Sequence, residues 1–387
     1  MIKKPLLMIP GPTPVPPEVL QALSTPMINH RGPAYEELQA ELVDQLKYVY
    51  QTQGDVIIYP AAGTGAMEAA IANVLSPGDR VLSVSIGVFG DRWAEIARRF
   101  GAEVTKHEVP WGRAADPEDV ARQIRSDGPF KAVLLTYNET STGVLNPLED
   151  LAKVARESGA LVMVDAISGL LAADLQTDAW GCDVVASGSQ KAYMLPPGLS
   201  FLSVSQKAWE AHEKATMPRF YWDFTQMRKS MAKNQTPYTP ALSLYYGLRV
   251  SLRSIREETL QGSFRRHARL AGATRAAAKA LGLELFADPA HASPAVTAIK
   301  VPEGLTPKEI RGRMLRDFSI TLAGGQGKIA DAIFRIGHLG YILEPDLVMT
   351  FSALERTLES LGRQVDRGAA VAAFQQELAS FDKAVTA

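Results

Sequence analysis

The polar run SGSQKAY at 187–193 contains the side chain best placed to do chemistry, Lys191, whose amine can act as a nucleophile. An apolar run at 183–186 precedes it and predicts a buried strand, and a second apolar run follows at 199–204. The Ser and Gly residues after the first run predict a turn at its end. Lys191 is therefore either an ordinary surface lysine beside a turn or an amine held at the edge of a sheet.

A third apolar run, LVMVDAIS at 161–168, carries the carboxylate of Asp165 at a predicted strand end. An ionised carboxylate there needs a partner, because an unpaired buried charge is costly. A strand-end Asp and a strand-end Lys are the pair that pyridoxal phosphate chemistry requires, since the Lys forms a Schiff base and the Asp keeps the pyridine nitrogen protonated. The alternative for Asp165 is a helix N-cap or a salt bridge in a loop.

Several ordered motifs point to a known family. They are SGSQKA followed by PPG at 196–198, VDAIS at 164–168, ETSTGVL at 139–145 and RIGHLG at 335–340. Together they resemble the class V aminotransferases, most closely the alanine–glyoxylate and serine–glyoxylate (serine–pyruvate) aminotransferase branch. The resemblance runs from PGPT at 10–13 to the last predicted helix. It implies pyridoxal 5'-phosphate as cofactor, with Lys191 and Asp165 as the catalytic residues.

The composition predicts a soluble protein with more than one domain. With 387 residues and 46% hydrophobic content, the chain can form two substantial cores. A net charge of -1 gives no basic field that would attract nucleic acid or an anionic membrane. The apolar stretch near the start is too short for a signal peptide or a membrane span. The single cysteine, Cys182, excludes an intrachain disulfide, so we expect a cytoplasmic protein.

A glycine-containing turn, AAGTGA at 61–66, follows a predicted strand at 56–59 and opens a helix. Free N–H groups at a helix N-terminus favour a phosphate, and glycine lets it approach the backbone. Such a turn can equally be a packing solution. The resemblance implies that Gly63, Thr64 and Gly65 cradle the cofactor phosphate, although the family often has another residue at the position of Thr64.

Strands and helices alternate through the first half of the chain. The pattern predicts strands at 80–86, 104–109, 132–137 and 161–165, and helices at 91–100, 117–124 and 148–157. It is typical of a three-layer α/β domain with a mainly parallel sheet, in which ligands bind at the carboxyl ends of the strands. The candidates that follow strands at this edge are Gly63, Phe89, Thr140, Asp165 and Lys191.

The resemblance also assigns residues to the cofactor ring. Phe89 occupies the place where the family stacks an aromatic side chain, often tryptophan, and phenylalanine keeps the stacking without the N–H. The alternative for Phe89 is a place in the ordinary core. Thr140 matches the position whose hydroxyl contacts the phenolic oxygen of the ring, and Ile167 the position on the opposite ring face. Gln190, next to the lysine, joins the cofactor site.

A stretch at 217–238, rich in aromatic and basic residues, follows a predicted surface helix at 206–214. Its length predicts an irregular segment that forms an interface or a lid. Its end resembles the segment that reaches across a dimer to the neighbouring subunit's phosphate. The resemblance therefore makes Gln235, Thr236 and Tyr238 candidates for cofactor binding and implies a homodimer with shared active sites.

The rest of the pattern divides the chain into an N-terminal arm at 1–20, a large cofactor-binding domain at 21–255 and a smaller C-terminal α/β domain at 256–387. The C-terminal pattern predicts one bent helix or two helices over 242–281, helices at 308–318, 346–361 and 369–381, and strands at 296–301 and 333–336.

Two further segments are expected near the mouth of the site. Prolines at 10–33 exclude long regular structure and indicate an arm across the surface or beside the site. Within it, His30 and Arg31 either line the entrance or lie on the surface. The run AGGQG at 323–327 resembles a glycine-rich loop at the site mouth.

Arg335 is the strongest candidate for binding substrate. It lies in a predicted strand, between Phe334 and Ile336, where a guanidinium needs a partner. A substrate α-carboxylate would accept two parallel hydrogen bonds from it. A structural ion pair is the alternative.

These residues predict transamination between a small amino acid, alanine or serine, and a small 2-oxo acid, glyoxylate or pyruvate, in a ping-pong reaction through a Lys191 Schiff base. No metal is expected. One alternative is a cysteine desulfurase or related class V lyase, which would need a reactive cysteine on a mobile loop. Others are a 2-aminoethylphosphonate–pyruvate aminotransferase and a hydrogenase-associated accessory subunit without catalytic activity.

Overall fold

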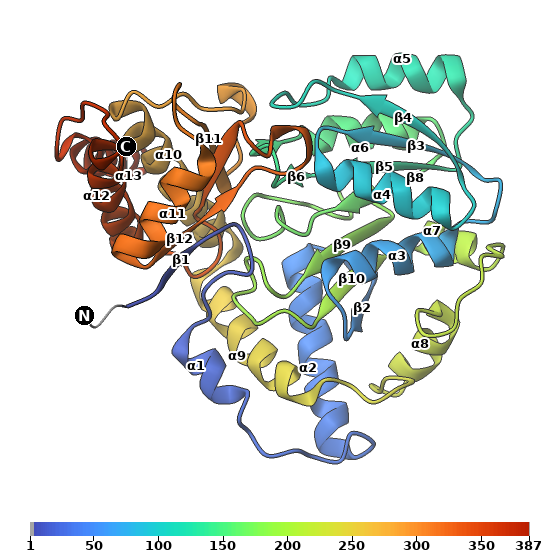
Figure 1. Ribbon diagram of the computed structural model, residues 1–387. Helices are drawn as coiled ribbons and strands as arrows, with labels where there is room; N and C mark the ends of the chain where they lie inside the picture. The colour runs from blue at the N-terminus through green and yellow to red at the C-terminus, as the bar shows by residue number, and fades with distance from the viewer. Residues whose placement is uncertain (1–3, 387) are drawn as a thin grey trace.

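The computed structural model describes residues 4–386, and a seven-stranded sheet forms the centre of its larger part (Figure 1). In spatial order the strands are β2 (Asp55–Tyr59), β10 (Ser200–Val204), β9 (Val184–Gly188), β8 (Leu161–Asp165), β5 (Ala132–Thr136), β3 (Arg80–Ser85) and β4 (Glu103–Glu108). β10 runs opposite to the other six strands, and every pair that does not include β10 is parallel. The predicted mainly parallel sheet is confirmed.

Helices cover both faces of this sheet. Successive strand residues point to opposite faces, and here both sets are apolar, so both faces need cover. Val56 and Ile58 join one core while Ile57 and Tyr59 join the other. On the first face lie α2 (Pro33–Tyr50), α5 (Pro117–Asp127), α6 (Leu148–Glu157) and α9 (Leu242–Glu258). On the second lie α3 (Gly63–Val74), α4 (Val88–Arg99), α7 (Gln206–His212) and α8 (Phe224–Met231). The result is the expected three-layer arrangement.

A second, four-stranded sheet forms the smaller part of the described chain. Its order is β1 (Leu6–Met8), β12 (Ile320–Gly324), β13 (Ile333–Gly337) and β11 (Val296–Lys300). It shares a core with α10 (Leu260–Ala280), α11 (Pro307–Phe318), α12 (Glu344–Ser360) and α13 (Ala369–Thr386). The smaller α/β part is thus as expected, while the predicted domain limits remain a prediction.

The remaining short elements are α1 (Pro17–Ala22), β6 (Asn138–Glu139), β7 (Val144–Leu145) and two 3-10 turns, η1 (Pro289–His291) and η2 (Gly327–Ile329). No helix within residues 4–386 combines the length and apolar composition needed to span a lipid bilayer.

Three sequence-based expectations about local structure were wrong. The stretch 217–238 is not irregular throughout, because Asp223 caps α8 and the helix buries Phe224 and Met227. The run 323–327 is not wholly a loop, because its first two residues end β12. The turn after β9 begins two residues later than expected, since pairing with β10 extends the strand to Gly188.

The N-terminal arm connects the two sheets. β1 pairs with β12, and the chain then crosses β13 so closely that a Cβ on Gly337 would lie 2.4 Å from the carbonyl group of Ile9. Farther on, Thr13 N–H donates to the carbonyl of Gln190 at 3.1 Å. The arm therefore runs directly beside the loop that carries Lys191. Of the two predicted courses, across the surface or beside the site, the structure has the arm beside the site.

We expect Gly337→Ala to lower the free energy of unfolding by about 1–3 kcal/mol, because its methyl group would overlap the arm backbone. Gly312→Ala in α11 is the matched control, since a Cβ there would meet nothing within 4 Å. It should leave stability unchanged or raise it by up to about 1 kcal/mol. Urea unfolding midpoints at equal slope measure both changes. A Gly337→Ala midpoint at or above that of the native chain would contradict the close crossing.

Candidate active site

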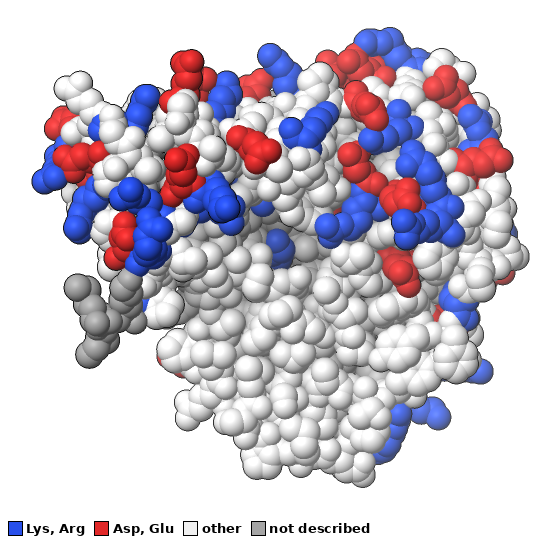
Figure 2. Space-filling model, in the orientation of Figure 1, with Lys and Arg blue, Asp and Glu red and all other residues white. Residues whose placement is uncertain are grey.

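Side chains from several strand ends meet in one pocket at the carboxyl edge of the large sheet. It is lined by Ala62, Gly63, Thr64, Phe89, Arg92, Asn138, Thr140, Asp165, Ile167, Ser168, Gln190 and Lys191. The surface is hollowed between the two parts of the molecule, and a basic side chain is visible at the bottom of the hollow (Figure 2). The lining includes most of the sequence-predicted cofactor residues and adds Ala62, Arg92, Asn138 and Ser168.

The Lys191 amine is buried and touches the N-terminal arm. Its Nζ donates a hydrogen bond to the carbonyl of Pro10 at 2.7 Å. Gly11 permits this approach, because a Cβ there would lie 2.6 Å from Nζ. Burial lowers the pKa of Lys191 to about 8, although the nearby Asp165 carboxylate acts in the opposite direction. The neutral fraction of this amine near neutral pH is therefore larger than that of an exposed lysine, although the protonated form still predominates.

The Asp165 carboxylate ends β8 and is 4% exposed. Its Oδ1 accepts the backbone N–H of Ile167 at 2.9 Å. Burial raises the pKa of Asp165 to about 7, while Lys191 and Arg92 lower it. Among the described residues no cation forms an ion pair with this carboxylate, so it can receive a protonated ligand atom.

The first turn of α3 borders the same pocket. Gly63 must lack a side chain, because a Cβ there would lie 2.5 Å from Ile167 Cδ1. Gly63 and Thr64 line the pocket with the N-terminus of the helix, where backbone N–H groups favour an anion. Gly65 does not line it. Its missing side chain instead makes room for Ala61 and the Trp222 ring.

Glu139 holds the turn that carries Phe89, and the sequence did not reveal this role. Its fully buried carboxylate accepts N–H groups of Phe89 at 3.0 Å and Gly90 at 3.2 Å. Its other oxygen accepts the N–H and hydroxyl of Ser141. Burial raises the pKa of Glu139, and these hydrogen bonds oppose the rise. The acid thus fixes the start of α4, and with it the Phe89 ring.

A polar network connects the other ring-side residues. The Thr140 and Ser168 hydroxyls lie 2.6 Å apart, and Asn138 Nδ2 donates to Ser168 Oγ at 2.8 Å. Among the described residues, Asn138 Oδ1 and Gln190 Oε1 are buried without a donor. The pocket therefore contains polar atoms with unused hydrogen-bonding capacity. Sequence proximity to Thr140 and Ile167 was the available signal for Asn138 and Ser168.

Arg335 projects from β13 and adjoins the pocket through Thr140. Its Nε donates to the carbonyl of Gly324 at 2.8 Å and its Nη1 to the carbonyl of Thr140 at 2.7 Å. Burial lowers the pKa of Arg335 to about 10, so the guanidinium stays charged at neutral pH. No carboxylate of the described chain forms an ion pair with it, and three of its five N–H groups remain available.

The three candidates near residue 236 do not line the pocket of their own chain. Gln235 Nε2 donates to Glu36 at 2.7 Å, and Thr236 has its backbone carbonyl bonded by Arg31. The Tyr238 ring stacks on Tyr221 with centroids 5.0 Å apart. Arg31 of the arm thus forms a hydrogen bond with the segment 235–238.

Comparisons with known proteins agree with this geometry. Residues 6–330 match the family described as Aminotransferase class-V. A Synechococcus protein named soluble hydrogenase, small subunit, is 46% identical over 98% of this chain and 100% of its own length. An L-aspartate–glyoxylate aminotransferase of Paracoccus denitrificans is 38% identical over 96% of this chain and 95% of its own.

Among solved structures, an alanine–glyoxylate aminotransferase from Nostoc superposes with a TM-score of 0.89 at 32% identity, covering 92% of this chain and 96% of that one. Fold, pocket and sequence therefore agree. The chain belongs to the class V aminotransferase family, whose members depend on pyridoxal phosphate.

Proposed function

We propose that the protein transfers an amino group from a small amino acid, alanine or serine, to a small 2-oxo acid, glyoxylate or pyruvate. The observation that carries this proposal is the burial of the Lys191 amine and the Asp165 carboxylate in one pocket beside the N-terminus of α3. The names of two similar proteins, both glyoxylate aminotransferases, favour glyoxylate as the acceptor.

The residues of the pocket fit pyridoxal phosphate. Asp165 offers an unpaired carboxylate oxygen to a protonated ring nitrogen, and Lys191 offers its amine to the aldehyde carbon. Phe89 and Ile167 are half-buried and line the pocket, so they can enclose the ring between them. The unsatisfied oxygen of Asn138 gives the pocket a further acceptor. When bound, pyridoxal phosphate supplies a conjugated ring that accepts the electron pair left as the substrate α-carbon loses its proton.

The protein's own groups would do the rest of the chemistry. Lys191 Nζ, neutral in part because burial lowers its pKa to about 8, can take the proton from the α-carbon. Asp165 holds the proton on the ring nitrogen, and the Arg335 guanidinium binds the α-carboxylate with its remaining N–H groups. In this structure, where the lysine amine is free, the Pro10 carbonyl accepts a hydrogen bond from it.

The lyase alternative has little support in the chain. Cys182 is 3% exposed, and burial raises the pKa of its thiol to about 12. A nucleophilic sulfur needs an accessible, low-pKa thiol. The Synechococcus relative has the name of a hydrogenase subunit, but it matches this class V aminotransferase chain over its whole length, so the name does not support the accessory-subunit alternative. Covalent coenzyme on Lys191 would exclude that alternative.

We also propose a homodimer in which each chain contributes to its partner's site. Figure 2 shows a broad face, over α1 and α9, that is almost free of charged side chains. Large apolar side chains are exposed on the segments that follow α1 and precede α8, with Met27 at 61% and Phe220 at 77%. Exposed apolar area of this kind marks interaction surfaces. The segment 235–238 contacts the exposed Phe220 and Glu36 of α2 rather than the pocket of its own chain, so in a two-fold dimer it would be available to the partner's pocket.

The function is tested by borohydride reduction of protein loaded with pyridoxal phosphate, followed by peptide mass mapping and a screen of amino donors. We expect the label on Lys191 alone, and loss of the coenzyme's aldehyde absorbance with alanine or serine. Glyoxylate should then restore it. Aspartate and 2-aminoethylphosphonate are included as competing donors. The control Lys207→Ala, which removes a partly exposed lysine, should keep the label. Protein that takes no label, or takes it elsewhere, would refute the proposal.

Coenzyme uptake should depend on pH through Lys191. Because only the neutral amine attacks an aldehyde, the uptake rate should rise with pH around a midpoint near 8. The Asp165 charge raises the pKa of Lys191, so Asp165→Asn should move the midpoint to lower pH and abolish most transamination. The exposed Asp119→Asn on α5 removes the same charge outside the pocket and should leave the midpoint in place. Stopped-flow absorbance measures these rates, and identical midpoints for both variants would contradict the coupling.

Shared sites predict complementation between inactive variants. In a mixed dimer of Lys191→Ala with Gln235→Ala/Thr236→Ala, one site receives both defects and the other receives neither. Co-refolding the two at equal amounts should give about a quarter of native activity, since half of the dimers are mixed and each has one intact site. Refolding Lys191→Ala alone is the control. Proven mixed dimers without activity would show that residues 235 and 236 serve only their own chain.

A further inference from the structure

Arg92 is a charged residue of the pocket that the sequence analysis did not identify and to which the proposed chemistry assigns no role. It is half-buried in α4 and lines the pocket with Lys191 and Asp165. Its guanidinium lies over the Phe89 ring, 4.7 Å from the centroid, and its Nη1 lies 3.4 Å from Thr64 Oγ1. Among the described residues Arg92 has this ring contact and this hydrogen bond, and neither partner is an anion.

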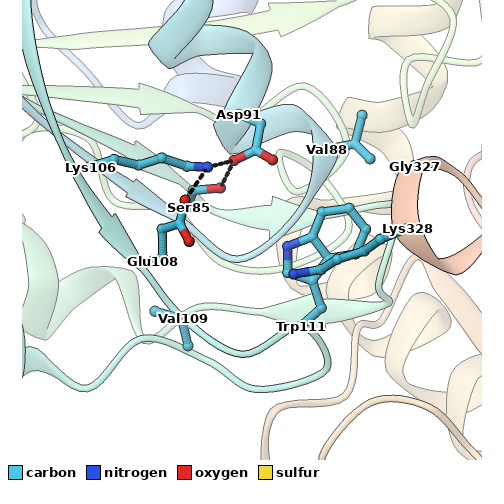
Figure 3. A pocket seen from close by; sticks show the side chains of 9 residues that line it. All are labelled: Ser85, Val88, Asp91, Lys106, Glu108, Val109, Trp111, Gly327 and Lys328. Carbon is cyan, nitrogen blue, oxygen red and sulfur yellow. Dashed lines mark hydrogen bonds and ion pairs between the residues drawn. The ribbon is translucent and has the colours of Figure 1, made fainter.

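The acid next to Arg92 in the chain is committed elsewhere. Asp91 Oδ1 lies 2.6 Å from Lys106 Nζ and accepts the Ser85 hydroxyl at 2.6 Å. Figure 3 shows this group in a separate hollow, where Lys106 also contacts Glu108 and Lys328 lies over Trp111. The charges around Asp91 are thus balanced within that hollow. Arg92 lines the coenzyme pocket, where the acid that its charge affects, Asp165, forms no ion pair with it among the described residues.

We propose that the Arg92 guanidinium binds the phosphate group of the coenzyme, an inference that rests on the proposed function. Its contact with Thr64 places it at the first turn of α3, where the backbone N–H groups favour an anion. A phosphate carries more negative charge than a helix N-terminus alone compensates. Two basic side chains line the pocket, Lys191 and Arg92. The Lys191 amine is assigned to the aldehyde carbon of the coenzyme. Arg92 therefore supplies the cation, with the planar fork suited to phosphate.

A second carboxylate on the substrate is the other anion that Arg92 could bind. The observations favour the phosphate, because Thr64 and the helix N-terminus lie beside Arg92 whereas the substrate's α-carboxylate is assigned to Arg335 on β13. Phe89 supports the same placement, since its ring holds the guanidinium against one flank of the pocket.

The test compares two aldehydes that differ only in the phosphate, pyridoxal phosphate and pyridoxal, by fluorescence titration of the coenzyme-free full chain. Arg92→Met should weaken pyridoxal phosphate on the order of 10- to 100-fold, the effect of removing a charged hydrogen bond. It should leave the affinity for pyridoxal unchanged. Arg92→Lys should show a smaller loss, because a point charge lacks the fork. Circular dichroism checks folding, and Arg92→Lys carries the test if Arg92→Met does not fold.

Two further variants make the outcome specific. Arg99→Met removes an exposed arginine two turns along the same helix and should leave both affinities unchanged. Arg335→Lys should raise the KM for amino donors but leave the pyridoxal phosphate affinity near native, the reverse of Arg92→Met. Equal loss for both aldehydes would mean that Arg92 acts through the Phe89 ring, and unchanged coenzyme affinity with a raised KM for aspartate would mean that it binds substrate. Either result overturns the inference.

Failure of this inference differs from failure of the proposed function. If the native chain does not bind pyridoxal phosphate on Lys191, the proposed function is refuted and the inference with it. If the native chain binds it and Arg92→Met binds it equally well, only the phosphate role is overturned.

Discussion

The structure depends on the burial of an amine and a carboxylate in the same pocket. Burial favours the neutral form of each group, and it lowers the pKa of Lys191 to about 8 and raises the pKa of Asp165 to about 7. Their mutual attraction opposes that shift, and neither group is fully satisfied by the surrounding protein. Such a site has a cost in stability, which the two cores flanking the large sheet must offset. In return, both groups can exchange protons near neutral pH.

The pocket is bounded by the N-terminal arm and by both sheets. The carbonyl of Pro10 reaches Lys191 because β1 anchors the arm to the small sheet and Gly337 lets it pass closely. From the same sheet, Arg335 bonds the carbonyl of Thr140 on the large part of the molecule. Backbone carbonyls of Pro10 and Thr140 therefore accept hydrogen bonds from the two proposed reactive groups, the Lys191 amine and the Arg335 guanidinium. A change at this junction is therefore expected to affect the site as well as stability.

Acids outside the reaction determine where the site's side chains lie. Glu139 gathers N–H groups at the start of α4, which places the Phe89 ring, and Asp91 is held by Lys106 on the outer side of the same helix. Arg92 follows Asp91 in the chain, and no carboxylate of the described residues forms an ion pair with it. The first turns of α4 thus position both the Phe89 ring, which can stack on the coenzyme, and the Arg92 guanidinium, which is proposed to bind its phosphate.

The sequence by itself determined the alternating strands and helices, the strand-end positions of Lys191 and Asp165, and the helix opening at Gly63. These follow from periodicity and turn chemistry, which act over a few residues. Only the tertiary structure decided which distant groups meet: β1 with β12, Pro10 with Lys191, and Glu139 with the Phe89 turn. It also formed α8 within a stretch whose length predicted an irregular segment, because Phe224 and Met227 pack into a core there. Such contacts depend on packing between segments remote in the chain, and no local pattern encodes them.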